Sequence, residues 1–203
     1  MPNAATLEND FYTRGDSGRL QQTDGTNDDY IRGWVGGVIY RNVAASTAVS
    51  ATTSETFFDK YATIDANTLK AGTVLKIRYQ GIATATNSTD TLAIKCYLAT
   101  GIVAGSITGT ALISAAAVDV ANNDTFSGEA TIIIRTAGAS GTLVASGLYK
   151  TTAAEGTATM KDDITASTTV DTTVAQYLGV SATWSTNNAG NSCRLDVIAV
   201  EMY

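Results

Sequence analysis

The stretch VLKIRYQGI, residues Val74–Ile82, decides the fold class of this chain. Apolar residues at positions 75, 77 and 79 alternate with polar residues at positions 76, 78 and 80. Successive side chains of a β-strand point to opposite faces of its sheet, so this two-residue period predicts a half-buried strand. The stretch LAIKCYL, residues Leu92–Leu98, repeats the pattern, with apolar side chains at positions 92, 94, 96 and 98.

The same kind of segment recurs along most of the chain. Further strands are expected at Trp34–Tyr40, Thr56–Ala62, Glu129–Arg135, Leu143–Tyr149, Ala158–Lys161, Ala175–Ser185 and Cys193–Tyr203. Turn-forming residues separate them at 86–90, 122–124, 138–141 and 187–191. Residues Val103–Ala121 are ambiguous, because their alanines allow a short helix while their glycines and β-branched residues suit loop and strand better. The pattern predicts an all-β, antiparallel, jelly-roll-like β-sandwich.

The composition argues against catalysis and metal binding. The 203 residues include no histidine, one proline and 16% charged residues, and imidazole is the side chain that enzymes and metal sites use most often near neutral pH. No local motif pairs the carboxylates Glu129, Glu155, Asp171 and Glu201. The acidic group at residues 24–29 lacks the terminal Glu of a calcium loop. We therefore expect no enzymatic activity, no metal and no cofactor.

Charge and hydropathy limit the possible partners. The net charge is −6, and the 13 Lys and Arg residues are scattered singly, which argues against nucleic-acid binding. No apolar run reaches the roughly 18 residues of a membrane-spanning helix, and no secretory signal is seen at the start. We expect synthesis in a cytoplasm, where Cys96 and Cys193 would stay reduced and act as small buried apolar side chains.

The first 33 residues differ from the rest. Residues 1–33 contain five Asp, three Arg and several glycines without a regular hydrophobic period. This segment is expected to form an extended N-terminal arm, followed by a sandwich domain at 34–203. Its spaced apolar residues are candidate anchors for docking along another surface; they are Phe11, Tyr12, Leu20, Tyr30 and Ile31.

The C-terminal strand carries apolar residues in both phases of its alternation. Cys193, Leu195, Val197 and Ala199 would share one face, and Ile198, Val200 and Met202 the other. A strand that is apolar on both faces requires cover on both. Another subunit can provide the second cover, and so can the arm or a long loop of the same chain. The candidate subunit interface consists of Leu195, Val197, Ile198, Val200 and Met202.

Several stretches together resemble a family of tailed-phage virion surface proteins. They are IDANTLKAGTVLKIR at 64–78, ATNSTDTL at 85–92, RTAG at 135–138, VSATWS at 180–185 and GNS at 190–192. Proteins of this family are jelly-roll sandwiches that form trimers on the capsid surface or at the heads of fibres. The resemblance covers residues 56–203 and leaves the arm unmatched.

The resemblance implies a non-enzymatic structural role in a bacteriophage virion. We expect a homotrimeric capsid decoration (cement) protein that binds the major capsid protein and stabilises the expanded capsid. The alternative is a receptor-binding head or adaptor of a tail or head fibre that recognises host surface glycans. Tyr97, Tyr149, Tyr177 and Trp184 are candidate aromatic platforms for that role, although the alternation around Trp184 places it in the core.

Overall fold

The computed structural model describes residues 11–13, 20–23, 28–30, 37–87, 89–114, 116–153 and 157–203. Side chains are described from residue 37 onward, except at 88, 115 and 152–165. Val38–Met202 forms one compact unit and Met1–Gly37 belongs to a second. The predicted domain boundary at 33/34 stays a prediction, because residues 31–36 lie outside the described part.

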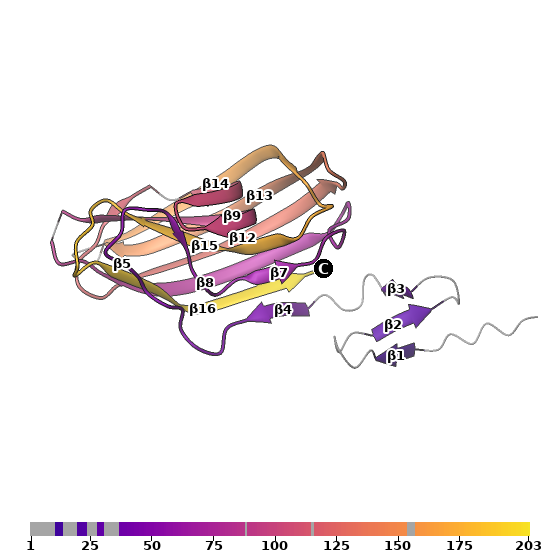
Figure 1. The fold of residues 1–203 in the computed structure, drawn as a ribbon, viewed down its shortest axis with the longest axis horizontal. Helices are drawn as coiled ribbons and strands as arrows, with labels where there is room; N and C mark the ends of the chain where they lie inside the picture. The colour runs from indigo at the N-terminus through magenta and orange to yellow at the C-terminus, as the bar shows by residue number, and fades with distance from the viewer. Residues whose placement is uncertain are drawn as a thin grey trace, which may run out of the picture. The chain divides into compact units, whose positions relative to one another are not determined.

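Two packed antiparallel sheets build the larger unit (Figure 1). The seven-stranded sheet has the order β14–β13–β12–β8–β16–β4, with β5 beside β16. Its strands are β4 (Gly37–Arg41), β5 (Val49–Ser50), β8 (Val74–Thr84), β12 (Asp124–Thr136), β13 (Gly141–Ala153), β14 (Thr157–Val170) and β16 (Ser192–Met202). The six-stranded sheet has the order β10–β9–β15–β6, with β11 beside β9 and β7 beside β15. Its strands are β6 (Thr56–Phe57), β7 (Ala62–Ile64), β9 (Thr91–Val103), β10 (Ser106–Ser114), β11 (Val118–Asp119) and β15 (Gln176–Trp184).

The connectivity is that of a jelly roll. The chain crosses between the sheets from β8 to β9, from β14 to β15 and from β15 to β16, so strands distant in sequence become neighbours. β16 lies between β8 and β4, while β15 lies between β9 and the short strands β6 and β7. β13 and β14 extend the first sheet as a meander after β12. The sequence-based fold class is therefore confirmed.

The inner faces follow the predicted alternation. On β8 the residues at 75, 77 and 79 are buried, and on β9 those at 92, 94, 96 and 98 are buried. One continuous core contains these side chains and those of β12, β15 and β16. Cys96 and Cys193 are both buried free thiols, and Trp184 lies in the core, as expected.

All four predicted turns connect strands. Their backbone hydrogen bonds run from Asp90 to Asn87, from Gly141 to Gly138 and from Asn191 to Asn188. In the fourth, the backbone N–H of Ala121 donates to the Asp124 carboxylate at 2.7 Å, and Asn123 adopts a left-handed φ of 61°. Asn tolerates this conformation better than most residues. The ambiguous segment Val103–Ala121 contains strands β10 and β11.

The described parts of the N-terminal segment form a small antiparallel sheet of β1 (Phe11–Thr13), β2 (Leu20–Thr23) and β3 (Asp28–Tyr30). Phe11 pairs with Gln22, and Gln21 pairs with Tyr30. These residues thus pair with one another as strands, and the docking role expected of the N-terminal arm stays a prediction. Strand pairing satisfies backbone groups without a periodic apolar face, so the absence of a hydrophobic period did not exclude such pairing.

Candidate interaction surface

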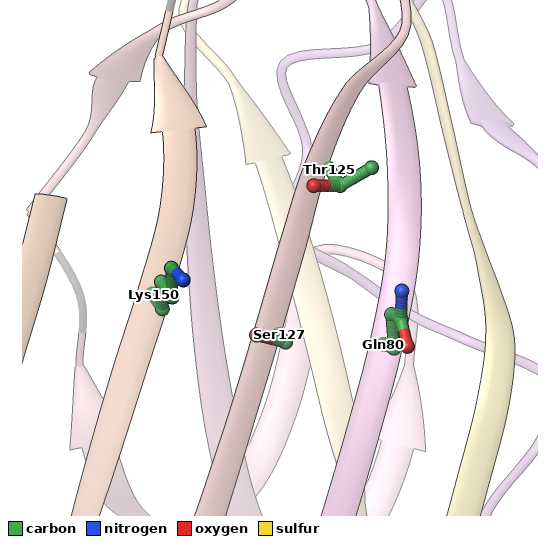
Figure 2. A pocket seen from close by; sticks show the side chains of 4 residues that line it. All are labelled: Gln80, Thr125, Ser127 and Lys150. Carbon is green, nitrogen blue, oxygen red and sulfur yellow. The ribbon is translucent and has the colours of Figure 1, made fainter. Parts of the chain in front are cut away.

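The outer face of the seven-stranded sheet is polar. Gln80 on β8, Ser127 on β12 and Lys150 on β13 are direct cross-strand neighbours. With Thr125 they line a hollow of about 220 Å³, in which the short Ser127 lies between two longer side chains (Figure 2). An exposed ion pair of 3.4 Å between Arg78 and Glu129 lies in the next row of this face. This face resembles the solvated side of an ordinary antiparallel sheet.

The outer face of the six-stranded sheet is different, because it carries a second apolar cluster. Leu178 and Val180 of β15 point into the core, so the residues that alternate with them, Tyr177 and Gly179, face outward. On β9, Tyr97 faces outward between the core residues Cys96 and Leu98. We call this cluster the aromatic patch; it contains Phe57, Tyr61, Tyr97, Ala99, Ile102, Ile107 and Tyr177.

The rings of the aromatic patch contact one another at steep angles. Phe57 and Tyr61 have ring centroids 5.8 Å apart at 68°, and Tyr61 and Tyr177 are 5.6 Å apart at 85°. Edge-to-face contacts of this kind are favourable for aromatic quadrupoles. Gly179 makes them possible, since a Cβ at that position would lie 2.6 Å from Cε1 of Phe57 and 2.8 Å from Cβ of Tyr61. The rings therefore lie directly on the sheet backbone.

A partly buried ion pair borders the aromatic patch. Lys95 Nζ lies 3.2 Å from Glu55 Oε2, and the buried Ser181 hydroxyl donates to Glu55 Oε1 at 2.7 Å. Burial by itself lowers the pKa of Lys95, but the hydrogen bond and charge of Glu55 raise it overall. Burial and the Glu55 charge also raise the pKa of Tyr97. Both Lys95 and Tyr97 thus stay protonated near neutral pH. The ion pair of Lys95 and Glu55 carries no net charge.

The structure corrects the prediction for the C-terminal strand. Leu195, Ile198 and Val200 are fully buried in the core of one chain, and Met202 is half-buried against that core. Only Val197 is exposed, at 49%. The pairing with β8 shifts register between Leu195 and Val197, and such a bulge moves the following side chains to the other face.

The strand is therefore apolar on one face, with its phase changed once. Leu195, Ile198 and Val200 have no side-chain surface left for a neighbouring subunit, and the argument for an interface on this strand fails. Of the predicted arm residues, Ile31 lies outside the described residues. Phe11, Tyr12, Leu20 and Tyr30 lie in the small N-terminal sheet, and their side chains are not among those described.

The aromatic residues expected to bind glycans are mostly covered. Tyr149 and Trp184 are core residues, and the indole N–H of Trp184 donates to the Val49 carbonyl at 3.2 Å. Tyr97 is buried within the aromatic patch, which leaves Tyr177 half-exposed. The sequence pattern does not single out Phe57 and Tyr61, because it predicts one regular strand over Thr56–Ala62. The structure has two short strands there, and both rings face outward.

Within the described residues, no three His, Cys, Asp or Glu side chains come together as metal ligands. In the same part of the chain, no helix has the length and hydropathy needed to cross a bilayer.

No protein-family model matches the sequence, and neither does any curated protein sequence. Among solved structures, a protein of unknown function from Shewanella oneidensis MR-1 is 14% identical, with a TM-score of 0.38 over 77% of this chain and 68% of that one. The seed lectin of Lotus tetragonolobus is 12% identical, with a TM-score of 0.34 over 96% and 90%. Lectin I-B4 of Griffonia simplicifolia, in its metal-free form, is 11% identical, with a TM-score of 0.30 over 85% and 96%. Scores this low give no basis for transferring a function.

Proposed function

We propose that this chain is a non-enzymatic structural protein of a tailed-phage virion, a homotrimeric capsid decoration protein that binds the major capsid protein and stabilises the expanded capsid. The observation that carries the proposal is the self-sufficiency of the sandwich. Its described core and the side chains packed on it run from Ile39 to Met202. The sandwich therefore has a core of its own, and we assign the docking role to the N-terminal segment, residues 1–33.

The physical basis is mass action. A ligand that binds only the expanded capsid stabilises that state in proportion to its concentration over its dissociation constant. Such a function needs buried area rather than a catalytic site. The many Thr, Ser and Ala side chains of the strands lose little rotamer entropy when covered, which favours binding by extended contact.

The alternative role, a fibre head that recognises host glycans, receives less support. Of its four candidate aromatic platforms, Tyr149 and Trp184 lie in the core and Tyr97 is buried by its neighbours. A sugar ring stacks on an exposed aromatic face, and Tyr177 is the remaining candidate among these four.

Cosedimentation with undecorated expanded heads tests the proposal. The full chain should pellet with expanded heads, and a variant lacking residues 1–33 should remain folded but fail to pellet. Alanine at Phe11, Tyr12 and Tyr30 should weaken binding, since buried aromatic anchors dominate most interfaces. Alanine at Thr13 and Gln22 provides the matched control in the same small sheet.

Undiminished binding of the truncated protein would exclude docking through the N-terminal segment. Full-length protein that binds host cell envelopes tightly, and heads not at all, would instead support the fibre role.

A further inference from the structure

We propose that the outer face of the six-stranded sheet, centred on the aromatic patch, is the surface through which copies of this chain associate. The inference rests on the self-association included in the proposed function and assigns it a place. It replaces the C-terminal strand, whose apolar residues are used within one chain.

The outer face of the six-stranded sheet carries few charges. Strands β6, β7, β9, β10 and β15 contain one charged residue in total, Lys95, and Glu55 neutralises it at 3.2 Å. The remaining strand, β11, adds the exposed Asp119 at the end of β9. The outer face of the other sheet carries Arg78, Glu129 and Lys150, among others. Two copies of a chain with net charge −6 repel each other on approach. The face with fewer charged side chains reduces that repulsion, so it is the face better suited to a second copy.

The rings of the aromatic patch are covered to different degrees. Phe57 and Tyr97 are each 8% exposed, and the ring contacts across the patch are at 59° to 85°. The accessible part of the patch is therefore formed by its half-buried members, which are Tyr61, Ile102, Ile107 and Tyr177. This mixed aromatic and aliphatic surface is typical of the core of a protein interface, where aromatic residues are enriched and charges depleted.

The outer face of this sheet has four strand positions, the last of which is shared by the short strands β6 and β7. Four positions about 4.8 Å apart, over roughly nine residues at about 3.3 Å per residue, make a face of roughly 600 Å² before side-chain relief is counted. A stable interface uses about 800 Å² on each partner. The flat face thus accounts for about three quarters of that area, and the relief of its side chains adds to it.

Light scattering after gel filtration of the full-length chain tests the inference. We expect the wild type at micromolar concentration to have a mass that is a multiple of 21.0 kDa. Tyr177→Glu and Ile107→Glu each place a charge in the patch and should reduce the mass to that of one chain. Val197→Glu is the matched control, because it charges an exposed apolar residue of the other sheet, and it should keep the wild-type mass. Far-UV circular dichroism and thermal unfolding verify that each variant is folded.

A wild type of 21.0 kDa would overturn the inference, and so would dissociation by Val197→Glu with none by the two patch variants. If both patch variants kept the wild-type mass but lost binding on a glycan array, the patch would belong to a glycan and the inference would also fail. The capsid assay is independent of these outcomes. A monomeric wild type that pellets with heads would leave the decoration role standing, whereas an oligomer that dissociates as expected but ignores heads would leave only the interface.

Discussion

Asp90 and Asn191 are two buried polar residues that hold together the loops at one end of the sandwich. The Asn191 side-chain amide donates to Asp90 Oδ2 at 3.0 Å, and its carbonyl oxygen accepts from the backbone N–H of Thr86 at 3.3 Å. Asn188 donates to the same carboxylate oxygen at 3.3 Å. Hydrogen bonds from Thr186, Asn191 and Asn188 outweigh the effect of burial and lower the pKa of Asp90. Loops 86–90 and 185–191 therefore share one polar network.

This network makes stability dependent on pH. Asp90 has a folded pKa below its ordinary value of 3.8, so its contribution is present above pH 3.8 and is lost as the pH falls through the folded pKa. We expect Asp90→Asn to lower the urea midpoint at pH 7 and to differ less from the wild type at pH 3. Asp65→Asn, at an exposed site, is the control. A difference that stays constant between pH 7 and pH 3 would contradict the prediction.

Glycine is required at position 128 because an aromatic ring occupies the space above it. A Cβ on Gly128 would lie 2.3 Å from Cζ and Oη of Tyr79, its direct cross-strand neighbour. Gly81 and Phe126 form a similar pair on the same two strands. Small residues thus make room for large rings in a thin core.

We expect Gly128→Ala to destabilise the fold by about 1–3 kcal/mol, the usual cost of overpacking a core. Gly101→Ala is the matched control, because the nearest atoms to its Cβ would be at an ordinary 3.6 Å. The free energies of urea unfolding measure both. Equal values for the two variants would show that the Tyr79 ring moves aside without cost.

At the scale of the element, the bulge in β16 explains why its residues appear apolar in both phases. Asp196 and Val197 together oppose Gln80, after which Ile198 returns to the core opposite Tyr79. Asn42, the residue after β4, holds the bulged strand, because its side-chain amide donates to the Asp196 carbonyl and its side-chain oxygen accepts from the Ile198 backbone N–H.

Two single deletions in β16 should therefore have opposite outcomes. Deleting Val197 removes the extra residue and leaves Ile198 and Val200 facing the core, so we expect a folded protein of reduced stability. Deleting Ala199 turns Val200 outward and brings Glu201 inward, so we expect no folded protein. Soluble yield and near-UV circular dichroism distinguish them. A folded Ala199 deletion would show that the register adjusts elsewhere.

The sequence predicts elements well where one alternation runs undisturbed. Residues 74–82 and 92–98 keep one phase. Both segments form strands whose apolar residues are buried in the core, as expected. A prediction from periodicity fails where an extra residue changes the phase of the alternation, as at Val197. Periodicity alone does not distinguish a strand with a bulge from a strand with two apolar faces. Periodicity also fails at Thr56–Ala62, where the chain forms the two short strands β6 and β7 instead of one regular strand.

At the scale of the whole molecule, the aromatic patch could not be predicted from the sequence. Its members come from residues 57–61, 97–107 and 177, which become neighbours only because β15 pairs with both β9 and β6. Strand order between distant segments is set by packing and not by local pattern. The sequence shows that these strands contain few charged residues, but only the structure shows that they lie in one sheet.

Both thiols lie in the shared core, so their reactivity should report opening of the whole sandwich. Burial raises the pKa of Cys96 and of Cys193 to about 12, which leaves almost no reactive thiolate at neutral pH. We expect a disulfide-exchange reagent to label neither thiol in native protein and two per chain in denaturant. Fast labelling of one thiol under native conditions would show that part of the core opens independently.

The internal positions of β15 and β16 have a consequence for synthesis on the ribosome. Each of the two sheets has, between two other strands, a strand that follows nearly all the others in the sequence. While the nascent chain ends before residue 176, β8 and β4 have no strand to join them, and neither do β9 and β6. Folding must therefore follow translation of these strands, and the long sequence separation of their partners makes it slow. Until then the unpaired edges of both half-sheets are open to neighbouring nascent chains, which ties the yield of this protein to its rate of production in the cell.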